Sequence, residues 1–421
     1  MNLNTVLNRL GIPDREDVFA EDWESSQRAL PVGGIPFLMP DYVTWACEAA
    51  YLPRGMTQAV LAVSKRIAAD EALCAFAWYC HHRLFQARER RVEIHRLPIL
   101  TAALGRDAGM FYVLILLAFT PQMQEVHHRR KIPADIVRDT VLNLKFCMEA
   151  EDYSQEFGQW GISPRILNWL MNHWRGELYR LGRLQFVPSR FHGKLRAFRH
   201  RAKGTVIALS EEGARYRSDG QVDGAGGVYD AADAWTATLN ITDTEIIGYP
   251  IAPVGHAIRN QVRLPTAEWA QVLAPGHPVL AIHIPAGSPM SFELCGESVR
   301  QALEFFPKHF PDKPFIAFTC HSWILDRQFE KLLPPTSNLV RFQKEMYLFP
   351  VAGGNESVLR AVFGRKTKDI SSAPRDTTMQ RAFARHIETG GHFRGGGCFL
   401  LKDDLNWGSQ FYRRQSLPWQ D

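Results

Sequence analysis

The chain has 421 residues, which is long for a single hydrophobic core and predicts two or three domains. Hydrophobic residues make up 46% of it and charged residues 22%, so the composition is that of an ordered globular protein and excludes bulk disorder. A net charge of +5 is too small to indicate nucleic-acid binding by itself.

Cysteine usage and the N-terminal sequence both favour a cytoplasmic protein. The seven cysteines form no CxxC pair and no even framework, which fits reduced thiols better than a disulfide scaffold. The N-terminus, MNLNTVLNRLGIPDRED, carries charges where a secretory signal needs an apolar run. The most apolar run, from Ala108 to Phe119, has 12 residues. A membrane span needs about 20 residues, so we expect a buried core helix there and no role in a membrane.

Residues 1 to about 190 are predicted to be helical throughout. Apolar residues recur at spacings of three and four over residues 56–85, 134–151 and 163–184. Helix starts are marked by proline or by a capping residue, and the clearest is Ser163 followed by Pro164 at the first helical position. The first part of the chain is therefore predicted to be a helical domain.

Two histidine-rich stretches of this domain do not indicate a metal site. Cys80, His81 and His82 are neighbours on a predicted helix and point about 100° apart, so they cannot chelate one ion together. Residues 127–131, HHRRK, are predicted to form a solvated helix end.

The segment from Leu178 to Ser210 holds eight Lys or Arg residues and no Asp or Glu. Such a run either attracts a phosphate-bearing partner or solvates a linker. Aromatic residues are sparse in it and no nucleic-acid motif accompanies it, which favours the linker and no nucleic-acid partner. A contribution to binding an anionic cofactor stays open.

After the basic segment the apolar pattern changes to period two. It predicts one hairpin from TVIALS and ARYRSDG across the turn EEG, and another from WTATLNIT and EIIGYPIAP across Asp243 and Thr244. A short helix (TAEWAQVL), a strand–helix–strand unit and a brief helix near DRQFEKLL come next. They are followed by a strand (LVRFQKEMYLF), two helices (ESVLRAVFG and TTMQRAFARHIETG) and, after the glycine-rich GGHFRGGG, a last strand (CFLL). This half is predicted to be mixed α/β with an antiparallel start.

Each strand of the strand–helix–strand unit, Val279 to Trp323, ends in a histidine. Units of this kind close right-handed and parallel, and their ligands lie outside the carboxyl ends of the strands. Alternation along the two strands allows His283 and His321 to share one face of the sheet. This crevice is where we expect chemistry.

The same region carries a family resemblance. The run HIPAGSP, a helix ending in FFPKHFP, and then FIAFTCHSWILD, LPPTSN and VRFQ resemble bacterial proteins described as acyltransferase-domain proteins. These combine an N-acyltransferase N-terminal helical domain, whose end resembles GISPRILNWLMNHWRGELYRLGRLQF, with a GNAT-like C-terminal domain. The resemblance implies an α+β fold, with a helical domain over residues 1–195 and a GNAT-like mixed α/β domain over residues 196–421.

The resemblance also implies a place for the acyl donor. Val279 to Pro285 matches the fourth GNAT strand, Phe292 to Phe306 the following helix, and Phe315 to His321 the fifth strand. In GNAT enzymes these strands splay apart, the pantetheine of an acyl-CoA lies between them, and the loop before the helix wraps the pyrophosphate. The cofactor-binding residues implied here are Ile284, Gly287, Ser288, Ser291 and Cys320.

The loop before the predicted helix suits an anion on physical grounds, because a helix N-terminus offers free N–H groups and a positive dipole end. The usual phosphate loop reads Gln or Arg, two residues, Gly, one residue, then Gly or Ala. This chain has AGSPMS, with one glycine and a proline that removes a donor. The site could hold CoA in a rearranged form, accept phosphopantetheine on an acyl-carrier protein, or have lost the cofactor.

Acyl transfer to an amine needs a base for the ammonium proton and an acid for the departing thiolate, and an imidazole can serve as either. We assign His283 as the base and His321, with Ser322, as polar groups at the acyl end. The competing interpretation is that both histidines are strand-end residues satisfied by backbone carbonyls. Cys320 would be a nucleophile only if it were reactive, and alternation places it on the face opposite His321.

The predicted function is transfer of an acetyl or other short acyl group from a CoA or carrier-protein thioester to an amine on a small molecule or peptide. Transfer is direct, and no metal is expected. One alternative is a non-catalytic ligand- or protein-binding module that retains a degenerate GNAT fold. A third possibility is a Cys-dependent hydrolase that uses Cys320.

Overall fold

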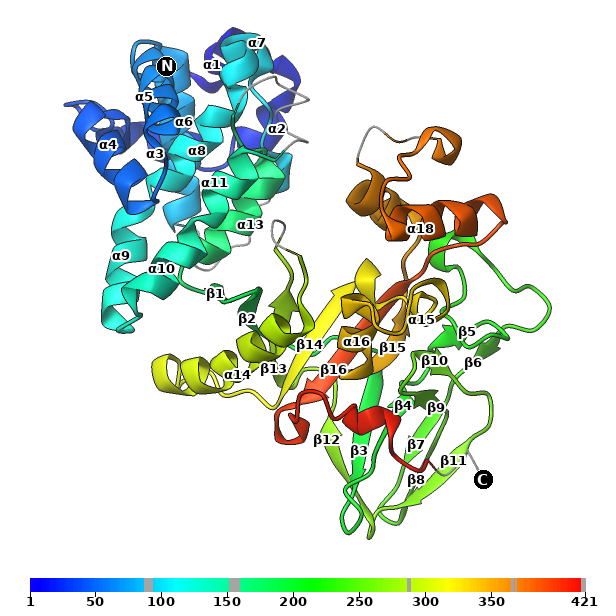
Figure 1. Cartoon of the computed structure of the whole chain (residues 1–421). Coiled ribbons are helices and arrows are strands. Elements are labelled where there is room, and N and C mark those ends of the chain that lie inside the picture. The colour runs from blue at the N-terminus through cyan, green and yellow to red at the C-terminus, as the bar shows by residue number, and fades with distance from the viewer. Residues whose placement is uncertain (87–93, 151–159, 286–288, 365–366, 368, 418–421) are drawn as a thin grey trace. The chain divides into compact units, whose positions relative to one another are not determined.

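The computed structural model describes residues 1–86, 94–150, 160–285, 289–364, 367 and 369–417 (Figure 1). The chain divides into two compact units, Met1–Arg180 and Leu181–Asp421, which we call the helical unit and the sheet unit. The predicted domain boundary at residue 195 falls inside the sheet unit, because the basic segment around it forms strands of two sheets.

The helical unit follows the predicted apolar periodicity. Its described α-helices are α1 (Leu3–Arg9), α2 (Glu16–Phe19), α3 (Trp23–Arg28), α4 (Pro40–Ala49), α5 (Arg54–Ala68), α6 (Glu71–Gln86), α7 (Thr101–Leu104), α8 (Ala108–Leu117), α9 (Thr120–Arg129), α10 (Ala134–Val141), α11 (Asn143–Met148) and α13 (Pro164–Trp174). Helix α13 begins as predicted, because the Ser163 hydroxyl accepts the N–H of Ile166 (3.4 Å) and Pro164 occupies the first turn.

The core of the helical unit is built around α8. Every residue of α8 is buried, and α4, α5, α6 and α13 contact it. By length and composition the stretch Thr101–Arg129 is apolar enough to cross a membrane, but most of its apolar window is buried inside the unit. The prediction of a buried core helix is confirmed, since a helix that is apolar on all sides is covered on all sides.

One prediction in this unit is wrong. His127 was expected at a solvated helix end, but it is buried, and its ring lies 5.7 Å from that of Tyr179. The rest of the stretch turns outward as predicted, with His128, Arg129 and Lys131 exposed and Arg130 half-buried. A helix end presents one face to the unit and one to solvent, so neighbouring residues differ in burial.

The described residues of the sheet unit form four sheets, with strand orders β1-β2-β13-β14-β16-β15, β10-β9-β4-β3-β12, β11-β8-β7 and β5-β6. Strand β1 spans the division between the units. The strands are β1 (Tyr179–Leu181), β2 (Leu184–Arg190), β3 (Leu195–His200), β4 (Val206–Ser210), β5 (Arg215–Tyr216), β6 (Trp235–Thr236), β7 (Leu239–Ile241), β8 (Glu245–Gly248), β9 (Pro250–Ala252), β10 (His256–Ala257), β11 (Val262–Pro265), β12 (Trp269–Leu273), β13 (Pro278–His283), β14 (Ala317–Ser322), β15 (Tyr347–Val351) and β16 (Gly395–Leu401). The helices are α14 (Phe292–His309), α15 (Phe329–Leu332), α16 (Asn338–Lys344), α17 (Asn355–Val358) and α18 (Thr378–Glu388).

Much of the predicted order of the sheet unit is confirmed. Strands β13 and β14, which precede and follow α14 in the chain, pair with each other in parallel, as the strand–helix–strand pattern predicted. Strands β7 and β8 form the predicted hairpin across Asp243 and Thr244. Helices α15, α17 and α18 and strand β16 also lie where they were expected, and α18 begins with a capping box formed by Thr377 and Gln380.

Four local predictions are wrong, in each case because tertiary pairing or capping overrides the local pattern. TAEWAQVL contains strand β12 rather than a helix, since it pairs with β3. TVIALS does not pair with ARYRSDG, because the wholly buried β4 lies between β3 and β9 while β5 pairs with β6. Residues 179–190 form β1 and β2 instead of continuing a helix, and the first half of LVRFQKEMYLF is α16, capped by Ser337.

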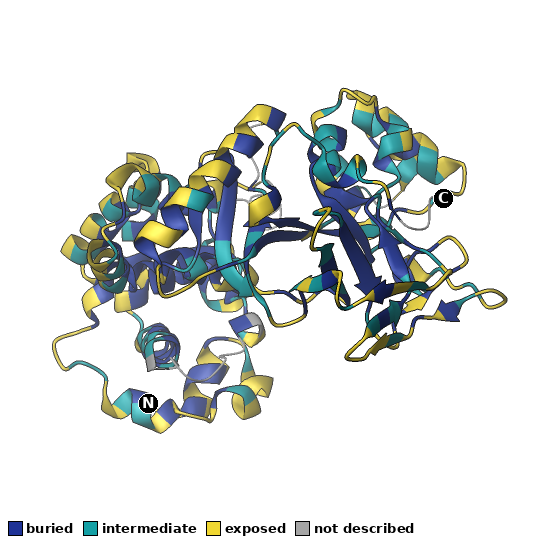
Figure 2. Ribbon diagram, turned by 90° about the horizontal axis from the view of Figure 1, so that it is seen from below, coloured by how far each residue is buried: buried dark blue, intermediate teal, exposed yellow. Residues whose placement is uncertain are grey.

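The six-stranded sheet has two different faces. The face with Phe186 and Phe318, whose rings lie 5.9 Å apart, looks toward α14, since Phe315 contacts Phe318 at 5.4 Å and Phe306 of α14 at 6.4 Å. On the other face, Tyr347 binds strands β4 and β9 of the second sheet through Ala208 and Ile251. In Figure 2 the strands are largely dark blue, whereas the helices alternate between buried and exposed residues.

Candidate active site

Strands β13 and β14 separate at their carboxyl ends. Their parallel pairing runs through Val279 with Ala317 and Leu280 with Phe318, and it ends at Ala281 with Thr319. Beyond that point β13 continues to pair with β2 as far as His283, and β14 continues to pair with β16 as far as Ser322. Each strand keeps its outer neighbour and leaves the inner one, so the pairing of β13 with β14 ends inside a continuous sheet, and we call this break in the pairing the opening.

The two predicted histidines flank this opening on one face of the sheet. Ala281 and Thr319 are direct partners and share a face, and His283 and His321 each lie two residues further along the same strands. The structure therefore places the two histidines on the same face of the sheet, as alternation predicted. The opposite face of the sheet is the one turned toward α14.

The environment of His283 keeps its imidazole neutral. The side chain is half-buried at the end of β13, and its Cα is paired with that of Gln185 on β2. Burial lowers the pKa of His283 from 6.5 to about 4. At neutral pH the ring is unprotonated and can accept a proton, although it is a weak base.

His321 is the more exposed of the pair, and its ring meets that of Phe349 edge-on at 5.5 Å. Although solvent reaches this side chain, partial burial lowers the pKa of His321, and the nearby imidazole of His192 lowers that pKa further. His192 thus belongs to the surroundings of the site. It follows β2 in the basic run, and no local pattern distinguishes it from the other charged residues there.

Ser322 and Cys320 do not share the histidine face. Ser322 alternates to the other side, where its hydroxyl accepts the N–H of Ile324 (3.4 Å) and caps the turn that follows β14. Cys320 is buried, and burial raises the pKa of its thiol to about 12. A thiol in that state is almost wholly protonated at neutral pH, which argues against a cysteine nucleophile.

Of the residues expected to hold the cofactor, Gly287 and Ser288 lie outside the described residues. Ile284 is half-buried just beyond β13. Ser291 is the N-cap of α14, where its oxygen accepts the N–H of Leu294 (3.4 Å) and its hydroxyl donates to Glu293 (3.1 Å). The helix N-terminus predicted beside the loop is present, but the Ser291 hydroxyl caps the helix itself.

A buried arginine joins the two sides of this loop, and the sequence patterns did not single it out. Arg183 is 7% exposed, and its guanidinium donates from Nη1 to the Pro285 carbonyl (2.9 Å) and from Nε to the Pro289 carbonyl (3.2 Å). It therefore brings a positive charge to the base of the segment where the resemblance places the pyrophosphate. Arg183 lies in the basic run at 178–210, which was the only sequence signal for it.

The position of Arg183 is determined by α14. Gly182 has a positive φ of 62° and forms the tight turn between β1 and β2, a conformation that glycine adopts readily. The N–H groups of Arg183 and Leu184 both donate to the Ser298 hydroxyl oxygen (2.9 and 3.3 Å), and this hydroxyl donates to the Leu294 carbonyl (2.8 Å). One serine of the helix therefore holds the turn that carries the arginine.

Among the residues that the structure describes, no three His, Cys, Asp or Glu side chains gather as a metal-binding group.

Two family descriptions match the chain. The N-acyltransferase N-terminal domain matches residues 42–176, and the GNAT-like C-terminal domain matches residues 178–400, more than half of the chain. The chain belongs to this acyltransferase family.

Solved structures share the fold of this acyltransferase. One is a mutant acyltransferase in complex with octanoyl-CoA, with a TM-score of 0.64. Two others, each with a TM-score of 0.63, are an acyltransferase with decanoyl-CoA and teicoplanin, and one with CoA and 10C-teicoplanin. All three are 20% identical to this chain, and the matches cover 95% of it and 99% of each solved chain. Among curated proteins, no sequence matches this chain.

Proposed function

We propose that the protein transfers an acyl group from acyl-CoA to an amine in the opening between β13 and β14. The observation that carries this proposal is the end of strand pairing at Ala281 and Thr319, with His283 and His321 on one face beyond it. The Arg183 guanidinium at the adjoining loop supports an anionic donor, because charge-assisted hydrogen bonds and a helix N-terminus both favour phosphate.

The proposed reaction is direct transfer. The amine nitrogen attacks the thioester carbonyl carbon, a C–N bond forms, and the C–S bond breaks to release CoA as the thiolate. Attack makes the nitrogen positively charged and far more acidic than a free ammonium, so a weakly basic imidazole is sufficient to remove its proton. We propose that His283 is the base that removes this proton, since its ring is neutral at physiological pH. His321 is proposed to face the acyl end of the substrate.

Three features of the substrates are part of the proposal. The related structures hold octanoyl-CoA, decanoyl-CoA or CoA, so eight- and ten-carbon donors deserve testing beside the acetyl and short acyl groups predicted from the sequence. Two related structures hold teicoplanin or 10C-teicoplanin, which supports an amine on a small molecule or peptide. An acyl-carrier protein is retained as an alternative donor.

The test measures free CoA thiol released from acetyl-, octanoyl- and decanoyl-CoA in the presence of simple amines. We expect release that depends on the amine, and a fall in kcat of about 100-fold in His283→Gln, since general base catalysis contributes about 10²–10⁴ in rate. The control is His128→Gln, an exposed histidine of the helical unit. Tight acyl-CoA binding without transfer would instead favour the non-catalytic binding module.

A further inference from the structure

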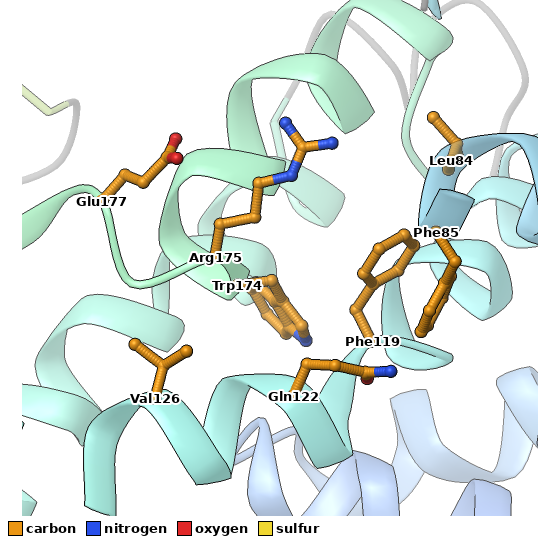
Figure 3. Close-up of a pocket in the computed structure, with 8 residues that line it drawn as sticks. All are labelled: Leu84, Phe85, Phe119, Gln122, Val126, Trp174, Arg175 and Glu177. Atoms are coloured by element: carbon orange, nitrogen blue, oxygen red, sulfur yellow. The ribbon is translucent and has the colours of Figure 1, made fainter. Parts of the chain in front are cut away.

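A pocket of about 350 Å³ lies in the helical unit, and the described residues that line it all belong to that unit (Figure 3). Its volume is within the range of small-ligand sites, which run from about 300 to 1,000 Å³. Neither the sequence motifs nor the proposed transfer site uses it. The residues that decide what it can bind come from α6, the start of α9 and the end of α13.

Aromatic rings form one wall of the pocket. Phe85 and Phe119 are stacked, with ring centroids 3.7 Å apart and planes at 28°, and His81 extends the stack with a centroid 3.8 Å from that of Phe85. Figure 3 shows the two phenylalanines facing each other beside Trp174. Phe85 lies between Phe119 and His81, so the wall offers a ligand ring edges and the outer face of Phe119, on which an aromatic ring packs in offset or edge-on geometry.

Two polar atoms beside this wall have no partner among the residues that the structure describes. Trp174 is 1% exposed, and among the described residues its indole Nε1–H has no hydrogen-bond acceptor. The Gln122 side-chain oxygen is also buried without a donor among those residues. In Figure 3 the indole nitrogen points toward the side of the pocket where Gln122 lies. Buried polar groups are paired in the great majority of cases, so these two atoms indicate a missing ligand group.

The pair of atoms specifies that group. Indole Nε1–H is only a donor and an amide oxygen is only an acceptor, so a ligand that pairs with both has to accept one hydrogen bond and donate another. A hydroxyl does both with a single oxygen. A saturated acyl chain does neither and would leave two buried polar atoms unsatisfied.

We propose that this pocket binds a hydroxyl-bearing aromatic ring, that is, a phenol. The ring packs on the outer face of Phe119, its oxygen accepts the Trp174 N–H, and its O–H donates to Gln122. Arg175 and Glu177 line the pocket and extend away from the aromatic residues, which suits a ring carried on a polar scaffold such as a peptide. This binding site does not depend on acyl transfer.

The binding test uses p-cresol and toluene, which differ only in the hydroxyl, on the full chain labelled with ¹⁵N and without CoA. The chain has eleven tryptophans. We expect p-cresol to shift one indole N–H signal, and the absence of that signal from the spectrum of Trp174→Phe assigns it to Trp174. We also expect p-cresol to bind about tenfold more tightly than toluene, a difference of about 1.4 kcal/mol.

Gln122→Met keeps the length of the side chain and removes its oxygen, so it should reduce the preference for p-cresol to below about threefold. Gln124→Met, an exposed residue of the same helix, should leave the preference unchanged. Equal binding of toluene and p-cresol by the wild type would overturn the proposal, and so would octanoate shifting the same indole signal more strongly than p-cresol.

Discussion

The contact between Arg183 and the loop before α14 makes a sharp prediction about donor binding. Arg183→Met keeps the apolar stem of the buried side chain and removes two charge-assisted hydrogen bonds, to the carbonyls of Pro285 and Pro289. Hydrogen bonds to charged groups contribute about 1.5–3 kcal/mol each, and water can replace part of that at the exposed Pro289. We therefore expect the free energy of unfolding to fall by about 2–4 kcal/mol.

The same change should weaken donor binding. If the loop holds the pyrophosphate, loss of the guanidinium raises the Kd for CoA about tenfold, which corresponds to about 1.4 kcal/mol. Urea unfolding measures the stability, and isothermal titration with CoA measures the affinity. The control is Arg190→Met at the end of β2, because Arg190 is exposed and its side chain donates to the Gly276 carbonyl (3.1 Å). An unchanged Kd for CoA in Arg183→Met, with the stability loss intact, would refute the assigned role in donor binding.

Three further predictions concern single residues. Ser298→Ala removes the oxygen that accepts the N–H groups of Arg183 and Leu184. We expect the free energy of unfolding in urea to fall by about 1–3 kcal/mol and the Kd for CoA to rise less than in Arg183→Met. An unchanged stability would show that the turn does not need this hydrogen bond. Cys320→Ala should leave acyl transfer within about twofold and the wild-type thiol should react slowly, since its pKa is about 12; rapid labelling with loss of activity would restore the hydrolase interpretation. The pKa of His127 is lowered by burial from 6.5 to about 4, so the unfolded state binds more protons between these values and stability falls as pH drops through this window, by up to about 3 kcal/mol. His127→Phe should flatten this fall in thermal or urea unfolding measured from pH 7 to pH 4, and an unchanged pH dependence would contradict it.

The sequence predicted the strand–helix–strand segment from β13 to β14 because its signals are local. Alternation along β13 and β14 placed His283 and His321 on a common face, and the segment between them has the periodicity and the capping serine of α14. The buried helix α8 was likewise evident from its uninterrupted apolar run. Each of these patterns depends on neighbours in the chain, so the order of residues is enough to reveal them.

Local patterns failed where a distant segment supplied the partner. TAEWAQVL has a helical pattern, yet β12 is a strand because β3 satisfies its backbone groups. The hairpin expected at EEG did not form because β4 is a wholly buried strand that lies between two others, and such a strand needs partners on both sides.

The sequence by itself determined a helical half, a strand–helix–strand unit ending in two histidines, and the family to which both halves belong. Tertiary structure alone decided that β13 and β14 separate after Ala281 and Thr319, because their outer partners β2 and β16 hold them apart. It also brought Arg183 against a loop about a hundred positions further along the chain, and it assembled the aromatic pocket from three separate helical segments. Contacts between residues so far apart in sequence arise from folding, and no local spacing records them.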